Sequence, residues 1–294
     1  MDDTERKNAP IGIFDSGLGG LTVARELAQA LPKESLIYVG DTARCPYGPR
    51  ALDEVQQYVL EICSFLQQQG VKLIVIACNT ATAAGLELAQ RRFDIPIIGV
   101  IEPGARAAVR ATRNRTIGVI GTIGTIISQV YSNAVCALDA GCTVYSVATP
   151  PFVEMVEDGL TFGVAEGEVR VPPDFPRIAQ QYLGNMRDWD VDTLVLGCTH
   201  YPLLQHAIAE VMGPEVVLVS SAHETARDVS ATLHRRGHES HANTPATYRF
   251  YTTGDIGRFA ELGSKVFGAS LDRLELLDIA SLEATADARD LDKE

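Results

Sequence analysis

Apolar runs that end in small and polar residues recur along the chain. One run covers residues 71–77 and leads into Cys78, and a second covers residues 191–197 and leads into Cys198. Such runs are typical of buried strands in a parallel sheet, and ligands bind beyond the carboxyl ends of these strands. The pattern therefore predicts that each thiol lies at the mouth of a sheet.

Three segments of the first half return in the same order in the second half. The pairs are 11–17 with 117–123, 36–42 with 143–149, and 71–80 with 191–200. Three matches in register indicate a duplication, and its period is far too long for a solenoid. We predict an α/β fold of two similar domains, each a mostly parallel sheet flanked by helices, facing each other across a cleft.

The same pattern indicates how the chain divides between the two domains. The first α/β domain is expected from residues 10–100 and 215–270, and the second from residues 101–214. The polar residues 1–9 and the acidic residues 282–294 are expected to be flexible termini.

Composition excludes several classes of function. The chain of 294 residues has a formal net charge of −13 and no basic cluster of the kind that follows a phosphate backbone, so nucleic acid is not an expected partner. We see no apolar run long enough to span a bilayer and no signal peptide, so we expect no membrane partner and a cytoplasmic location. A small molecule is the expected ligand.

Cysteine usage points to chemistry rather than to disulfides. Six cysteines in a chain of this size, with no secretory signal, are expected to be reduced. Cys63, Cys136 and Cys142 are expected to be core residues, the usual environment of a cysteine. Cys78 and Cys198 differ, because each follows a small residue at a strand end and precedes polar groups. The sequence has no CxxC or HExxH pair, so we expect no metal.

The common cofactor motifs do not occur. Residues 15–20 form a glycine-rich turn between a predicted strand and a predicted helix, where backbone N–H groups can meet an anion. The turn lacks the spacing of the dinucleotide (GxGxxG) and Walker (GxxxxGK) loops. No lysine lies in a polar strand-end motif, so pyridoxal phosphate is not indicated. We therefore expect no cofactor.

Two thiols that face one cleft suit proton transfer at a carbon next to a carboxylate. A thiolate is a compact base whose pKa can be tuned towards the working pH. Inverting a stereocentre in either direction needs one base and one acid that exchange roles, and Cys78 and Cys198 meet that need. Asp15, His200 and Glu157 are candidates to assist the thiols, because each is a titratable group near a predicted sheet mouth.

A single helix is expected over residues 123–138. Thr122 and Thr125 stand three residues apart at its start. Threonine usually caps a helix at such a place, and its hydroxyl can also donate a hydrogen bond to a carboxylate.

Four segments resemble the signature segments of the glutamate racemases, within the aspartate/glutamate racemase superfamily, and they occur in the right order. They are 15–20 (DSGLGG), 40–48 (GDTARCPYG), 78–83 (CNTATA) and 197–202 (GCTHYP), and the resemblance covers about residues 10–270. It implies two facing α/β domains that enclose the substrate and interconvert L- and D-glutamate by two bases without a cofactor. It further implies that D-glutamate supplies peptidoglycan synthesis in a bacterial cytoplasm. A homodimer is kept as an open alternative.

The resemblance also implies roles for individual residues. Cys78 would deprotonate D-glutamate and Cys198 would deprotonate L-glutamate, with Asp15 and His200 assisting the thiols and Glu157 near His200. The expected substrate-binding residues are Asp15, Ser16, Pro46, Tyr47, Gly48, Asn79, Thr80, Thr122, Thr125, Thr199 and His200, of which Pro46, Tyr47 and Gly48 would receive the side-chain carboxylate.

Three other readings of the sequence stay open. An aspartate or hydantoin racemase would share the two cysteine segments, although the segment 41–48 favours glutamate, since its backbone can donate to a distal carboxylate. A Cys-His hydrolase would need one essential cysteine rather than two. A binding protein would close its two domains on an amino acid without exchanging the α-proton.

Overall fold

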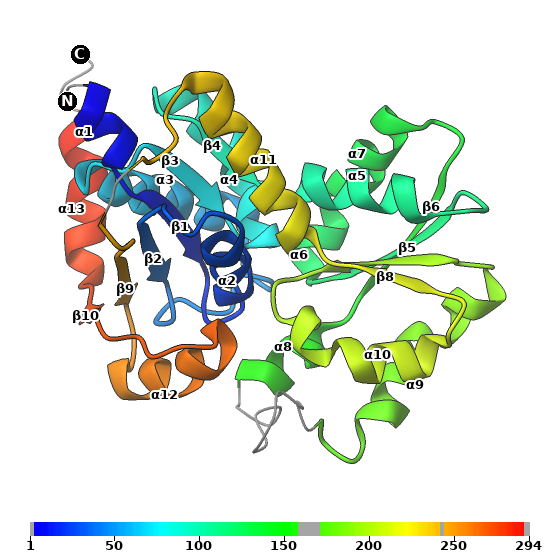
Figure 1. Cartoon of the computed structure of the whole chain (residues 1–294). Coiled ribbons are helices and arrows are strands. Elements are labelled where there is room, and N and C mark those ends of the chain that lie inside the picture. The colour runs from blue at the N-terminus through cyan, green and yellow to red at the C-terminus, as the bar shows by residue number, and fades with distance from the viewer. Residues whose placement is uncertain (1–2, 158–170, 242–243, 291–294) are drawn as a thin grey trace.

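Two parallel sheets organise the molecule, which is a computed structural model that describes residues 3–157, 171–241 and 244–290 (Figure 1). The strand order is β10-β9-β2-β1-β3-β4 in the first sheet and β6-β5-β7-β8 in the second. The first sheet contains β1 (Ile11–Asp15), β2 (Leu36–Gly40), β3 (Leu73–Ile76), β4 (Ile97–Gly99), β9 (Tyr248–Thr252) and β10 (Leu274–Leu276). The second contains β5 (Thr116–Gly121), β6 (Thr143–Ala148), β7 (Thr193–Gly197) and β8 (Val217–Val219). Each sheet with its helices is one domain.

The predicted duplication is present in the strand order. Strands β2-β1-β3-β4 and β6-β5-β7-β8 follow the same sequence of neighbours, and all the pairings are parallel. The strands that precede the two cysteines, β3 and β7, are equivalent, and each lies beside the central strand of its sheet. The predicted fold class is therefore confirmed. The first sheet carries two further strands, β9 and β10, on the outer side of β2.

Helices cover both faces of each sheet, because the strands are apolar on both sides. Around the first sheet lie α1 (Asp3–Asn8), α2 (Leu21–Ala30), α3 (Leu52–Gln68), α4 (Asn79–Arg92), α11 (Ser221–Arg236), α12 (Ile256–Phe267) and α13 (Ile279–Asp290). Around the second lie α5 (Ile101–Ala111), α6 (Ile123–Ile127), α7 (Val130–Leu138), α8 (Pro150–Glu157), α9 (Phe175–Asp188), the short 3-10 helix η1 (Tyr201–Leu204) and α10 (Gln205–Met212).

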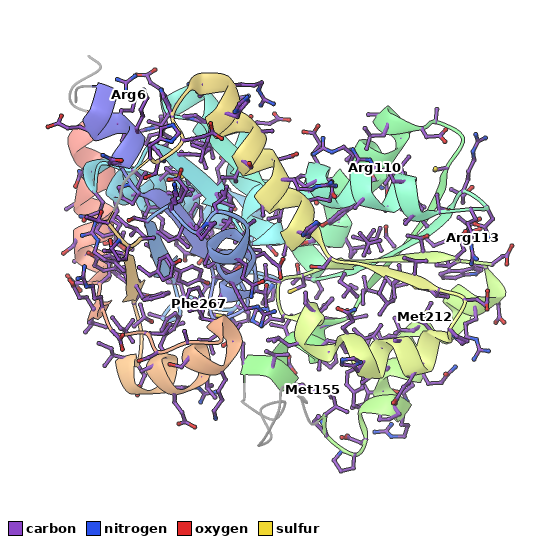
Figure 2. The ribbon with its side chains drawn as sticks, viewed as in Figure 1. Arg6, Arg110, Arg113, Met155, Met212 and Phe267 are labelled. Carbon is purple, nitrogen blue, oxygen red and sulfur yellow. The ribbon has the colours of Figure 1, made fainter. Side chains whose placement is uncertain are left out.

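Alternate side chains of the central strands supply two cores per domain. Ile11 and Ile13 of β1 pack with α2, α11 and α12, whereas Phe14 packs with α3, α4 and α13 on the other face. Side chains fill the space between the sheets and these helices (Figure 2). The domains join where α5 meets α11, and Arg110 pairs with Glu224 there, with 3.0 Å between Nη1 and Oε2 (Figure 2).

The division of the chain differs from the expected one at residue 215. Strand β8 pairs with β7 in the second sheet, with Thr193 opposite Val217, and the chain re-enters the first domain only with α11. The first domain also extends beyond residue 270, because β10 pairs with β9. The three residues of β8 are apolar and would fit either sheet, so the sequence does not indicate which sheet this strand joins.

Helix α1 and most of helix α13 fall in the segments that were expected to be flexible termini, of which residues 1–2 and 291–294 lie outside the described residues. The Lys72 ammonium donates to the carbonyl of Lys7 at the end of α1, over 2.6 Å, and this contact holds α1 against the first domain. Helix α13 packs on α3, and its Leu282 is completely buried.

The single helix expected over residues 123–138 is two helices, α6 and α7. The Ser128 hydroxyl donates to the carbonyl of Thr125 over 2.7 Å, and Gln129 takes a left-handed backbone conformation with φ of 56°. The hydroxyl satisfies a carbonyl at the end of α6, and the left-handed residue turns the chain into α7.

Candidate active site

The two cysteines end equivalent strands and line one small cavity. Cys78 follows β3 and caps α4, where its sulfur accepts from the Ala81 N–H over 3.4 Å. Cys198 follows β7, and each cysteine is 6% exposed. The space between the walls is about 10 Å³, which is room for a single water molecule. The domains are therefore nearly closed on each other.

Most of the residues predicted from the sequence line this cavity. They are Ser16, Pro46, Tyr47, Gly48, Cys78, Asn79, Thr80, Thr122, Cys198, Thr199 and His200, and Val153 lines the cavity without having been predicted. Asp15, Thr125 and Glu157 do not line it but contact residues that do.

Cys198 belongs to a chain of three polar groups. Its sulfur is 3.4 Å from Nδ1 of His200, and Nε2 of His200 is 2.5 Å from Oε1 of Glu157. Burial lowers the pKa of His200, but the neighbouring Cys198 and Glu157 outweigh burial and raise that pKa well above its ordinary value. Burial raises the pKa of Glu157, and the bond from His200 more than reverses this, so the pKa of Glu157 is lowered. The imidazole is thus held as a cation beside the sulfur.

Cys78 has a different environment. Its thiol donates to Oγ of Ser16 over 3.9 Å. Burial, and then the charge of Asp15, raise the pKa of the Cys78 thiol above its ordinary value. In this closed state the surroundings therefore favour a neutral thiol at Cys78, while a cation lies beside Cys198.

Asp15 is bound by the glycine-rich turn. Its Oδ2 accepts from the N–H groups of Gly17 and Gly20, each over 3.1 Å, and its Oδ1 accepts from the Thr199 hydroxyl of the other domain over 3.2 Å. Burial raises the pKa of Asp15, with His200 and the two N–H groups opposing the rise. The anion position predicted at this turn is thus occupied by the chain's own carboxylate. Asp15 acts on Cys78 through its charge, since no hydrogen bond joins them among the described residues.

The turn needs glycine because the second domain approaches its backbone closely. A Cβ at Gly17 would lie 2.5 Å from Oε1 of Glu157. A Cβ at Gly19 would lie 2.5 Å from Oγ1 of Thr199 and 2.8 Å from Nδ1 of His200. A side chain at Gly17 would displace the Glu157 carboxylate, and one at Gly19 would collide with the Thr199 and His200 side chains.

Three threonine hydroxyls from the two domains meet at the cavity. Thr80 Oγ1 is 2.8 Å from Thr122 Oγ1, and Thr122 Oγ1 is 3.0 Å from Thr125 Oγ1. Thr122 also caps α6 by accepting from the Thr125 N–H, so both roles expected for this pair are available to it. Hydroxyls that donate to one another can turn to donate to a carboxylate instead.

A buried ion cluster that was not predicted from the sequence holds the segment that contains Tyr47. Arg44 donates to Asp41 over 2.7 Å and to Glu61 over 2.5 Å, and Tyr47 donates to the same Asp41 carboxylate. Arg44 also stacks over the ring of Tyr58. The only sequence signal was Asp41 and Arg44, three positions apart within a polar motif, and nothing marked Glu61 as their partner. The cluster fixes the backbone of the loop that reaches the cavity.

The remaining cysteines are free thiols, and one of them differs from the prediction. Cys63 is buried in the first domain as expected, whereas Cys136 is exposed on α7, whose inner face is formed by Tyr131 and Val135 instead. Cys142 is half-buried.

No group of three or more His, Cys, Asp or Glu side chains that could hold a metal occurs in the described part of the chain. Nor does that part contain a helix long and apolar enough to cross a membrane.

Comparison with known sequences gives a consistent result. A glutamate racemase from Bacillus cereus is 46% identical over 268 residues, which cover 91% of this chain and 96% of that protein. A glutamate racemase from Exiguobacterium sibiricum is 49% identical over 257 residues, covering 87% of this chain and 92% of that protein.

Solved structures of similar fold carry the same name. A glutamate racemase isoform from Bacillus anthracis has a TM-score of 0.85 and 43% identity, and the match covers 93% of this chain and 98% of that one. The glutamate racemase from Francisella tularensis in complex with D-glutamate has a TM-score of 0.84 and 33% identity, covering 95% and 99%. The sequence model of the Asp/Glu/Hydantoin racemase family matches residues 11–229. By sequence and by fold, this chain belongs to the Asp/Glu/Hydantoin racemase family of enzymes.

Proposed function

We propose that this enzyme interconverts L- and D-glutamate, with Cys78 and Cys198 exchanging protons with the substrate Cα from opposite sides. The observation that carries the proposal is that equivalent strands of the two domains bring both thiols to one cavity. The names of the relatives, and the D-glutamate bound to one of them, support glutamate as the substrate.

The surroundings of the two sulfurs suit one proton transfer in each direction. With L-glutamate, the Cys198 thiolate beside the His200 cation takes the α-proton, so the C–H bond breaks and an S–H bond forms. The electron pair stays on the substrate as a carbanion, and the Cys78 thiol donates its proton on the opposite face. Cys78 is then the thiolate and Cys198 the thiol, which is the state that accepts D-glutamate. The assignment of each thiol to one enantiomer rests on the family resemblance.

Binding of the two carboxylates stabilises the carbanion, because donors held in place need no reorganisation during the reaction. We assign the α-amino and α-carboxylate groups to Ser16, Asn79, Thr80 and Thr199. We assign the side-chain carboxylate to the loop around Tyr47, which the buried ion cluster fixes. The threonines at the start of α6 add further donors.

The biological role follows from the product. We propose that D-glutamate made by this enzyme is used in peptidoglycan synthesis in the cytoplasm, and the free state of the six cysteines is compatible with a reducing compartment. Assembly as a homodimer stays a prediction.

The decisive experiment is incubation of the purified protein with L-glutamate in D₂O. Circular dichroism should decay as D-glutamate forms, and proton NMR should show loss of the α-proton signal. A binding protein would produce neither change, and an aspartate or hydantoin racemase would act on its own substrate in preference to glutamate.

The roles of the thiols are tested by substitution. Cys78→Ser and Cys198→Ser should each lower racemisation by roughly 10³-fold or more, because an alcohol is a far weaker acid and base than a thiol. Cys63→Ser is the matched control, since Cys63 is buried in the same domain as Cys78 but does not line the cavity. Full activity in either of the first two variants would contradict the two-base assignment, and loss in only one would favour a Cys-His hydrolase.

A further inference from the structure

We propose that Tyr131 is a positioning residue that orients the amide of Asn79, so that the amide nitrogen faces a carboxylate of the bound substrate. The proposal rests on the proposed function, because it assumes that Asn79 binds substrate. Tyr131 itself does not line the cavity.

The first observation concerns Asn79. It begins α4 directly after Cys78, is 3% exposed, and lines the cavity that contains both thiols. Its Nδ2 is buried and has no hydrogen-bond partner among the described residues. Leaving a buried donor unpaired is unfavourable, so such a donor at the wall of a cavity indicates an acceptor supplied by a ligand.

The second observation explains which way the amide faces. The Tyr131 hydroxyl, on α7 of the other domain, donates to Oδ1 of Asn79 over 2.7 Å. Burial raises the pKa of Tyr131, so the phenol keeps its proton and remains a donor. If the amide were turned over, Oδ1 would face the cavity and repel a carboxylate, and the phenolic proton would lose this acceptor.

Two glycines leave room for the tyrosine ring. A Cβ at Gly104 would lie 3.1 Å from the Tyr131 hydroxyl oxygen, and a Cβ at Gly197 would lie 3.2 Å from Cε2 of the ring. Gly197 directly precedes Cys198, and Asn79 directly follows Cys78. Tyr131, which is 2% exposed, therefore joins the segments that carry the two thiols.

The test compares Tyr131→Phe with Tyr251→Phe. Both remove one hydroxyl from a buried ring, but Tyr251 lies on β9 and its hydroxyl meets only the Arg249 guanidinium at 3.4 Å in the described structure. For Tyr131→Phe we expect KM for both enantiomers to rise about tenfold with kcat within about twofold, and for Tyr251→Phe no change. In an Asn79→Ala background, Tyr131→Phe should have no further effect, because the amide it orients is gone.

Each outcome decides the question. An unchanged KM in a folded Tyr131→Phe variant, or a full additional effect in the Asn79→Ala background, would overturn the positioning role. If Tyr131→Phe does not fold, Gly104→Ala keeps the phenol but crowds its oxygen, and it should also raise KM. Calorimetric titration with D-glutamate separates the two proposals: should the wild type bind without racemising, the proposed function fails, and a tenfold weaker Kd in Tyr131→Phe would still support the role of Tyr131.

Discussion

Glu157→Gln isolates the part that charge plays at Cys198. Glutamine keeps the size of the side chain and a hydrogen bond to His200, but it removes the anion that lies 2.5 Å from Nε2. Hydrogen bonds to charged groups contribute about 1.5–3 kcal/mol. Because the Glu157 side chain is 22% exposed, we take the lower end of that range. About 1.5 kcal/mol corresponds to a tenfold slower proton transfer at Cys198.

The two enantiomers should respond differently. With L-glutamate, Cys198 acts first, so α-proton exchange and racemisation should both fall about tenfold. With D-glutamate, Cys78 acts first, so the carbanion still forms. Because proton donation from Cys198 is slower, the carbanion is reprotonated to D-glutamate more often than it is converted to L-glutamate. Exchange into D-glutamate should therefore exceed racemisation by a larger factor than in the wild type.

The assay measures both rates in D₂O, with proton NMR for loss of the α-proton and circular dichroism for inversion. Glu154→Gln is the control, because Glu154 lies on the same helix but is exposed and does not contact His200. Since Glu157 helps to raise the pKa of His200, the alkaline fall in activity should also move to lower pH in Glu157→Gln. Equal losses of exchange and inversion for D-glutamate would refute the reasoning.

Two further predictions concern Asp15 and metals. Burial raises the folded-state pKa of Asp15 above its ordinary 3.8, so the ionised carboxylate destabilises the fold above that raised pKa. Asp15→Asn should therefore lower activity yet raise Tm at pH 7.5 by roughly 2–4 °C, and calorimetry should find the gain shrinking as the pH falls towards 4. Dialysis against EDTA should leave racemisation unchanged, whereas activity that vanished and returned with added metal would reveal a ligand set that the motifs do not indicate.

The repeated apolar runs were enough to predict the fold. Each run indicates a buried strand, and the return of three runs in the same order indicates the duplication. The edge strand β8 was assigned to the wrong domain, since three residues fit either sheet. The break between α6 and α7 depends on one serine hydroxyl and one left-handed residue, and neither interrupts the apolar pattern.

Within the candidate site, polar residues next to strand ends were predictable, and nearly all of them line the cavity. Residues that contact the cavity-lining side chains without lining the cavity themselves could not be predicted. Tyr131 lies in an apolar helix where an aromatic residue usually means packing, and its contact with Asn79 is made across the two domains. Arg44 and Glu61 are 17 positions apart, so only folding brings them together.

The path of the chain through the two sheets also determines the order in which their strands can form during translation. The polypeptide leaves the first sheet after β4, completes the whole second sheet, and only then returns to add β9 beside β2. Domains form as their residues emerge from the ribosome. Throughout translation of residues 100–247, β2 therefore remains an unpaired edge, the kind of surface on which other nascent strands can aggregate. The last third of the chain protects the first third, and premature termination before β9 should yield an aggregating product.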